Sequence, residues 1–382
     1  MTHLKPALLR LALPAFFVVY LTGALFTVVQ QVMALPFPLS IFMDFGFYDQ
    51  ALQRALSGGD MYAVRSIGEA YLYPPPALLA VDLLRVIPDF YLRVAFWGAL
   101  DFLMAGWLVY AVARRYNIEL GDVWYWFPLA LGFGPLLVTV EFGQINMLTQ
   151  FGVLIMFLYE TTFTGWAGFG LGLAILTKVT PLFFGAYLLA TRNLRTLLWT
   201  TVAIVVISAV AILRYGIQPF ITYIDVFRSL TSTVNVGAHA QSLIVLLLPL
   251  VGVEKLALLQ FGLTFYLLAI ILLAAYVAFR SGRSEPSLIV TALAMMLSPN
   301  IVWYHHYVFF LLPLFVWMAW QRSNKAVTLW CMGGMLVVQF DYFLLSQGLL
   351  IHLFGHLSIL IVLVQGMMGL GAKITKPSVQ QA

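Results

Sequence analysis

The sequence predicts an all-α protein that crosses a membrane many times. Of its 382 residues, 62% are hydrophobic and only 9% are charged, and the mean hydropathy is +0.96. Soluble domains are typically about 45–50% apolar and about 25% charged. Several apolar runs reach the roughly 20 residues that a helix needs to cross a bilayer. A polytopic helical membrane protein is therefore the class that fits these observations.

The charge pattern and the single cysteine exclude other classes. Cys331 lies inside an apolar run, so no disulfide framework is expected. The net charge of +5 comes from short basic clusters between apolar runs, which is typical of topology determinants and not of nucleic-acid binding. Because the run after Lys5 and Arg10 has no small-residue cleavage site, we expect a retained first helix and not a signal peptide.

The first predicted span covers residues 11–33 and is followed by a first outer loop over about 34–90. The positive-inside rule places Lys5 and Arg10 in the cytoplasm, so this loop is outside. The loop is expected to contain a short helix over 48–57, which two glycines end. A rigid proline-rich stretch over 73–76 and an interfacial helix over 77–86 are expected after it.

The remaining spans alternate between basic inner connections and polar outer ones. Residues 166–190 are interrupted at Lys178-Val179-Thr180-Pro181, and two short spans there keep Arg192 and Arg195 inside. The other spans are expected at 91–113, 123–140, 145–159, 197–213, 256–279, 287–297, 307–320, 326–345 and 349–370. This gives about twelve spans in one domain over 1–382, with both termini cytoplasmic and a second outer loop over about 215–254.

Asp44 is the candidate catalytic residue, because it follows the first span at the outer face, where acidic residues gather. Ionisable groups close to apolar spans are rare and often functional. A partly desolvated carboxylate there suits general base catalysis of glycosyl transfer. The alternative is a solvated loop aspartate or a helix N-cap. Asp49 is expected on the helix surface, and without a ligand cluster no divalent cation or other cofactor is expected.

Lys178, His305 and His306 are candidate residues for binding the phosphate or the sugar of a lipid-linked sugar substrate. An ammonium group at a helix break can bind a lipid phosphate, although Lys178 can also be a snorkelling interfacial lysine. A histidine can hydrogen-bond a phosphate or a sugar hydroxyl, although both histidines can also belong to an aromatic belt. Further hydrogen-bonding candidates, each also explained as a turn or packing residue, are Tyr73, Gln144, Asn146, Gln241 and Ser242.

Six stretches occur in an order that resembles glycosyltransferase family 87. They are Asp44-Phe45-Gly46-Phe47-Tyr48, Gly58-Gly59-Asp60-Met61-Tyr62, Tyr73-Pro74-Pro75-Pro76, Gly143-Gln144-Ile145-Asn146, Ala167-Gly168 with Lys178-Val179-Thr180-Pro181, and Ser298-Pro299 through Trp303, His305 and His306. The family's asparagine-glutamine-serine stretch differs here, because Ala240 precedes Gln241-Ser242 and Asn235 is displaced.

The resemblance implies a GT-C-type fold with a site that faces out of the cytoplasm of a bacterial inner membrane. It implies a polyprenyl-phosphate sugar donor, with mannose as the default, and a glycolipid, glycan or protein acceptor. Asp44 matches the family's catalytic base, which gives inversion, and His305 or His306 matches the histidine tied to the donor phosphate. The alternative function is a transporter or flippase of lipid-linked saccharides, which shares many spans and broken helices.

Overall fold

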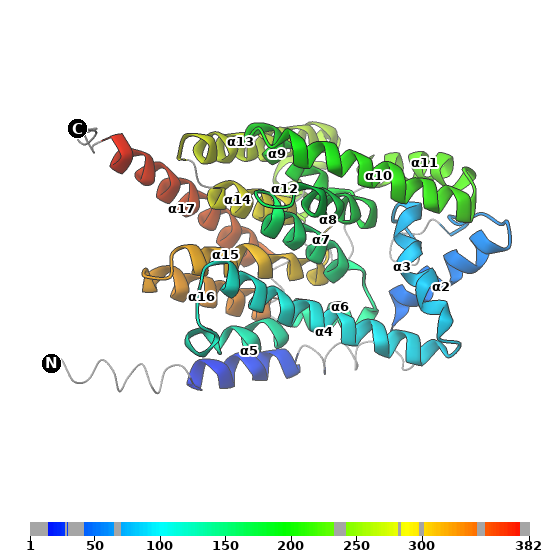
Figure 1. Ribbon diagram of the computed structural model, residues 1–382, viewed down its shortest axis with the longest axis horizontal. Coiled ribbons are helices and arrows are strands. Elements are labelled where there is room, and N and C mark those ends of the chain that lie inside the picture. The colour runs from blue at the N-terminus through cyan, green and yellow to red at the C-terminus, as the bar shows by residue number, and fades with distance from the viewer. Residues whose placement is uncertain are drawn as a thin grey trace.

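The computed structural model describes residues 14–26, 29, 42–64, 70–232, 242–281, 284–297, 302–341 and 348–374. Within these ranges the chain is helical and contains no strand. The long helices run alongside one another, and α2 and α3 lie together at one end, at the right of Figure 1. We call this the α2 end. The predicted all-α class is confirmed for the described part of the chain.

Among the described residues, four helices are long and apolar enough to cross a membrane: Phe90–Arg115 (α4), Leu194–Tyr215 (α10), Val253–Ser281 (η5 Val253–Lys255 and α13 Leu256–Ser281) and Leu349–Met368 within α17 (Leu349–Ile374). Side-chain caps begin two of them. Asp89 accepts a hydrogen bond from the Leu92 amide before α4, and Asn193 accepts one from the Thr196 amide before α10. The protein is therefore membrane-embedded, while the expected total of about twelve spans and the GT-C architecture remain predictions.

Shorter apolar helices complete the bundle. The first is Pro14–Phe26. The others are α5 (Trp126–Leu131), α6 (Gly134–Phe142), α7 (Asn146–Tyr159), α8 (Thr164–Thr177), η4 (Thr180–Leu182), α9 (Phe183–Ala190), α12 (Leu243–Val251), α14 (Glu285–Met296), η6 (Tyr304–Phe310), α15 (Leu311–Trp320) and α16 (Lys325–Asp341). The break predicted at Lys178 separates α8 from η4 and α9. The span predicted over 123–140 is instead divided between α5 and α6.

The segment predicted as the first outer loop carries α2 (Met43–Leu56), η1 (Pro75–Ala77), α3 (Leu78–Leu83) and η2 (Leu84–Val86). The expected helix over 48–57 begins earlier than predicted, at Met43, so Asp44 lies in its first turn. Gly58, with φ of 77°, allows the chain to turn away after α2. The predicted interfacial segment over 77–86 forms η1, α3 and η2 and does not cross the bundle.

Glycines let α7, α8 and α10 pack closely. A Cβ at Gly152 would lie 2.5 Å from the Gly170 carbonyl oxygen, and one at Gly168 would lie 2.4 Å from the Trp199 Cβ. Small residues allow close backbone approach between membrane helices. This packing holds α8 against α7 and α10, and Lys178 follows the last residue of α8.

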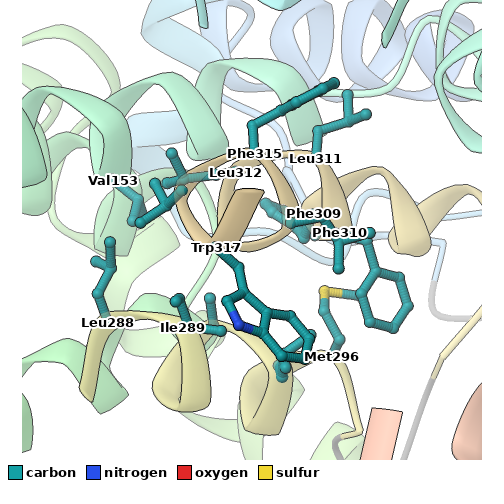
Figure 2. Packing of buried hydrophobic residues seen from close by; sticks show 14 of the residues in the cluster. Val153, Leu288, Ile289, Met296, Phe309, Phe310, Leu311, Leu312, Phe315 and Trp317 are labelled. Carbon is teal, nitrogen blue, oxygen red and sulfur yellow. The ribbon is translucent and has the colours of Figure 1, made fainter. Parts of the chain in front are cut away.

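A large apolar core joins the C-terminal helices to α7. In Figure 2, Trp317 of α15 lies against α14, whose Ile289 and Met296 approach it. Phe309 and Phe310 of η6 and Leu311 of α15 extend this packing, and all three are at least 96% buried. The histidines at the start of η6 are therefore attached to a rigid element.

Candidate active site

Asp44 lies in the first turn of α2, at the α2 end of the bundle. The Phe42 amide donates to the Glu141 carbonyl at 2.7 Å, which joins the start of α2 to the end of α6. Phe45 and Tyr48 are buried beneath the helix and hold it in place. The helix N-terminus carries a partial positive charge that favours a carboxylate. Asp44 itself is half-buried.

Gln144 connects Asp44 to two tyrosines. Its Nε2 donates to Asp44 Oδ2, and its Oε1 accepts from the hydroxyls of Tyr48 and Tyr73, both at 2.9 Å. The backbone carbonyl of Gln144 accepts a hydrogen bond from Trp97 Nε1 at 3.1 Å. A phenol hydroxyl facing Oε1 donates to it, so the two tyrosines fix the orientation of the amide. The Gln144 NH₂ group is therefore held toward one oxygen of Asp44.

Lys178 is held beside this group by Asn146. Lys178 Nζ donates to Asn146 Oδ1 at 3.1 Å, and Asn146 Nδ2 donates to the His305 carbonyl at 3.4 Å. The ammonium nitrogen also lies 5.5 Å from the Phe309 ring centroid and 6.0 Å from that of Tyr73. Cations near aromatic faces gain a favourable electrostatic contact. Lys178 thus has several contacts but no carboxylate hydrogen-bonded to it among the described residues.

His305 and His306 begin η6 and are buried. Thr139 Oγ1 donates to the His305 carbonyl at 3.2 Å, and the Trp303 amide donates to His306 Nδ1 at 3.3 Å. The two imidazole rings are 4.6 Å apart, at 89°. Across the described residues, neither Nε2 atom has a hydrogen-bond partner. Two buried ring nitrogens are therefore left able to bind a further group.

Burial brings the pKa values of Asp44 and Lys178 close to neutrality. Burial raises the pKa of Asp44 to about 7, against the lowering effects of the Gln144 hydrogen bond and the Lys178 charge. Lys178 lies in the break between α8 and η4, and burial lowers its pKa to about 7, against the effect of Asp44. The two charges are close enough to stabilise each other. Such matched groups near pH 7 are typical of acid–base sites.

Burial also lowers the pKa values of His305 and His306, and the positive charge of Lys178 lowers them further. Both rings are therefore neutral at pH 7. A neutral imidazole has one N–H donor and one acceptor nitrogen. The basic side chains of the site are thus one lysine and two uncharged imidazole rings.

The structure brings together Asp44, Tyr73, Gln144, Asn146, Lys178, His305 and His306 through the contacts above. Ser242 is buried at the start of α12, and no hydrogen bond from its hydroxyl is found within the described ranges. Gln241 lies outside the described residues.

The prediction that Asp49 lies on the helix surface is wrong. Asp49 is 7% exposed, because its carboxylate pairs with Arg93 at 2.6 Å and accepts from Gln53 at 2.8 Å. Arg93 lies in the first turn of α4, 44 residues away. A partner that distant leaves no local signal around Asp49.

Tyr48 and Trp97 contact Gln144 but were not predicted as site residues. Tyr48 was detectable, because it lies four residues after Asp44 and residues at that spacing share a helix face. Trp97 lies in a predicted span, with Arg93 and Asp101 four residues before and after it, and neither of them indicates a contact with Gln144. In the described ranges, no group of three or more potential metal ligands occurs.

The sequence matches the family model of glycosyltransferase family 87 over residues 71–299. This range is more than half of the 382-residue chain. It includes Tyr73, Gln144, Asn146 and Lys178, while Asp44 and the two histidines lie outside it and join the site through their contacts. No match was found to a curated protein or to a solved structure.

Proposed function

Since this chain belongs to glycosyltransferase family 87 and is a membrane glycosyltransferase, we propose that it transfers a sugar from a polyprenyl-phosphate donor to an acceptor hydroxyl. Mannose is the default sugar, and the acceptor is a glycolipid, a glycan or a protein. The proposed site faces the extracytoplasmic side. The observation that supports this proposal best is the grouping of Asp44, Gln144 and Lys178 at one end of the helical bundle.

Asp44 is the proposed general base. One carboxylate oxygen accepts the proton of the acceptor hydroxyl while the hydroxyl oxygen attacks the anomeric carbon. The bond from that carbon to the donor's phosphate oxygen breaks, and polyprenyl phosphate leaves with the electron pair. Attack opposite the leaving group inverts the anomeric centre. The other oxygen, Oδ2, is held by Gln144, which orients the carboxylate, and a pKa of about 7 suits a base at neutral pH.

Lys178 and the paired histidines are the proposed phosphate-binding groups. An ammonium binds phosphate as a point charge, and an anionic phosphate raises the pKa of the lysine and keeps it charged. The unpartnered Nε2 atoms of His305 and His306 give neutral hydrogen bonds to the phosphate or the sugar. These groups stabilise negative charge as it develops on the leaving group.

A lipid-linked donor fits the position of these residues. They lie at the end of a bundle whose described part contains four helices of membrane-crossing length. A polyprenyl chain stays in the bilayer while its phosphate and sugar reach the interface. Because the leaving group is already a phosphate, a positive side chain can stabilise it, and we propose that no cofactor is required.

The test is to compare wild type with Asp44→Asn on a short-chain polyprenyl-phosphate mannose, measuring release of polyprenyl phosphate with candidate acceptors. We expect the variant to bind the donor and to lose turnover. Full turnover in the variant would remove Asp44 from the mechanism. Movement of the sugar lipid across vesicles without bond cleavage would favour the transporter function.

A further inference from the structure

A recess of about 420 Å³ lies at the end of α7 away from Asp44. Asn146, which contacts Lys178, begins α7, and Glu160, which lines the recess, follows its last residue. A helix of 14 residues is about 21 Å long. The recess is therefore separate from the candidate active site, and its walls come from the C-terminal ends of α9 and α13 and from the connections that follow α7, α9 and α13.

Glu160 supplies a buried acceptor in this recess. Its side chain is 2% exposed, and its Oε2 accepts from the Tyr187 hydroxyl at 2.5 Å. Asn193 Nδ2 fixes the backbone by donating to the Glu160 carbonyl at 2.9 Å. The other carboxylate oxygen, Oε1, has no hydrogen-bond partner within the described ranges. Burial raises the pKa of this carboxyl, while the Ser284 hydroxyl and the positive charge of Arg115 also act on it and lower the pKa. A buried carboxylate oxygen without a partner is costly, so a cationic N–H donor that enters the recess is favoured there.

Arg192 supplies a positive charge at the mouth of the same recess. Its guanidinium lies 4.9 Å from the Phe279 ring centroid, and its backbone has a φ of 57°, which non-glycine residues rarely adopt. The next residue, Asn193, caps the 22-residue helix α10. Helix N-termini attract anions, so Arg192 and the start of α10 together favour a phosphate. The recess thus offers an acidic partner inside and a basic partner at its mouth.

The surface next to the mouth is apolar. Leu189 of α9, Leu194 of α10 and Tyr276 and Phe279 of α13 all have exposed side chains. Two of these helices, α10 and α13, are long enough to cross the membrane. Exposed apolar side chains on such helices contact lipid acyl chains. A ligand that combines a polar head with apolar tails therefore fits the recess and its surroundings better than a wholly polar solute.

We infer that this recess binds the headgroup of a phospholipid in which a primary ammonium is joined to a phosphate. The ammonium donates to Glu160 Oε1, the phosphate lies at Arg192 and the α10 N-terminus, and the acyl chains cover the exposed leucines and Phe279. This site is independent of the sugar-transfer reaction proposed above. Phosphatidylethanolamine has this headgroup, whereas phosphatidylcholine has no N–H group to donate.

Native mass spectrometry of the purified full chain tests the site with three probes: phosphatidylethanolamine, phosphatidylcholine with the same acyl chains, and free phosphoethanolamine. We expect phosphatidylethanolamine to bind about tenfold tighter than phosphatidylcholine, the scale of a lost hydrogen bond to a charged group. Free phosphoethanolamine should bind more weakly still, because it lacks the acyl chains. Equal binding of the two lipids would overturn the proposal, and equally tight binding of the free headgroup would overturn the lipid assignment.

Variants then locate the site. Arg192→Gln should weaken the binding of both lipids, because both carry the phosphate, whereas Arg195→Gln should leave their binding unchanged, because Arg195 is also exposed but does not line the recess. Glu160→Gln keeps an acceptor for Tyr187 and should lose the preference for phosphatidylethanolamine. If Arg195→Gln and Arg192→Gln weaken binding equally, the site is not this recess. If Glu160→Gln lowers the melting temperature equally with and without lipid, and keeps the lipid preference, the carboxylate belongs to an internal ion pair and the proposal fails.

Discussion

Replacement of Gln144 by leucine should move the pH dependence of sugar transfer. Gln144 donates to Asp44 Oδ2 and favours the ionised carboxylate, and burial raises the pKa of Asp44 to about 7 against that effect. A base must be ionised to accept a proton, so activity falls as the pH drops below its pKa. Without the Gln144 donor, the pKa of Asp44 rises further, and the acid limb of the profile moves to higher pH.

The size of this shift follows from the lost hydrogen bond. A hydrogen bond to a charged group contributes about 1.5–3 kcal/mol, and 1.36 kcal/mol corresponds to about one pKa unit. Because Asp44 is partly exposed, we expect the lower end, about one unit. The ionised fraction at pH 7 then falls from about half to about one tenth, so kcat at pH 7 falls about fivefold.

The assay is kcat against pH at a saturating concentration of a polyprenyl-phosphate sugar. Saturating donor keeps Lys178 protonated through its phosphate, so the acid limb reports Asp44. The matched control is Gln53→Leu, since Gln53 makes the same kind of bond to Asp49 on the same helix, at 2.8 Å. The control should leave the limb unchanged. A lower plateau with an unmoved limb in Gln144→Leu would refute the assigned effect on the pKa.

Five further substitutions separate catalysis from stability. Asp44→Asn should lower kcat about 10²–10⁴-fold. It should not lower the melting temperature at pH 8, because burial destabilises the ionised carboxylate of the wild type at that pH. A fall in both kcat and the melting temperature would indicate a structural role for Asp44. Asp49→Asn should lower the free energy of unfolding by about 3–5 kcal/mol, measured by denaturant titration, because it breaks a buried ion pair. Lys178→Ala should raise the donor KM about tenfold or more, and an unchanged KM would assign Lys178 to packing. Gly168→Ala should lower the free energy of unfolding by about 1–3 kcal/mol, because the added Cβ would lie 2.4 Å from the Trp199 Cβ. The control is Gly106→Ala, whose Cβ would meet nothing within 4 Å and which should be neutral or slightly stabilising in the same titration.

Local signals in the sequence predicted several elements well. Lys178 and Pro181 lie within an apolar run, and a charge and a proline both disfavour a continuous helix, so the break between α8 and α9 was predictable. The division of residues 123–140 into α5 and α6 had a signal too. Gly132 and Gly134 with Pro135 lie at that point, and such residues commonly interrupt helices. The hydrophobicity of the whole run hid this signal.

The early start of α2 depends on tertiary contacts. Gly46 suggests an irregular segment before Tyr48, because glycine in a helix interior is unfavourable. In the structure Phe45 is fully buried, and the Phe42 amide is bonded to the Glu141 carbonyl. Packing against α6 therefore stabilises the first turn of a helix that local propensity disfavours. The site needs this turn, because it carries Asp44.

The types of site residue were readable from the sequence, but their pairings were not. Asp44 and Gln144 are 100 residues apart, and Asn146 and His305 are 159 apart. No periodicity links positions at such separations, so only the order of the motifs brought them into one hypothesis. The pairings nevertheless decide the chemistry. Asp44 lies next to Gln144 and Lys178 and has a pKa of about 7. Asp49 lies five residues along the same helix, but both of its carboxylate oxygens are bound by Arg93 and Gln53, so neither oxygen is free to act as a base. Two aspartates on one short helix therefore differ in role because of partners that lie far away in the chain.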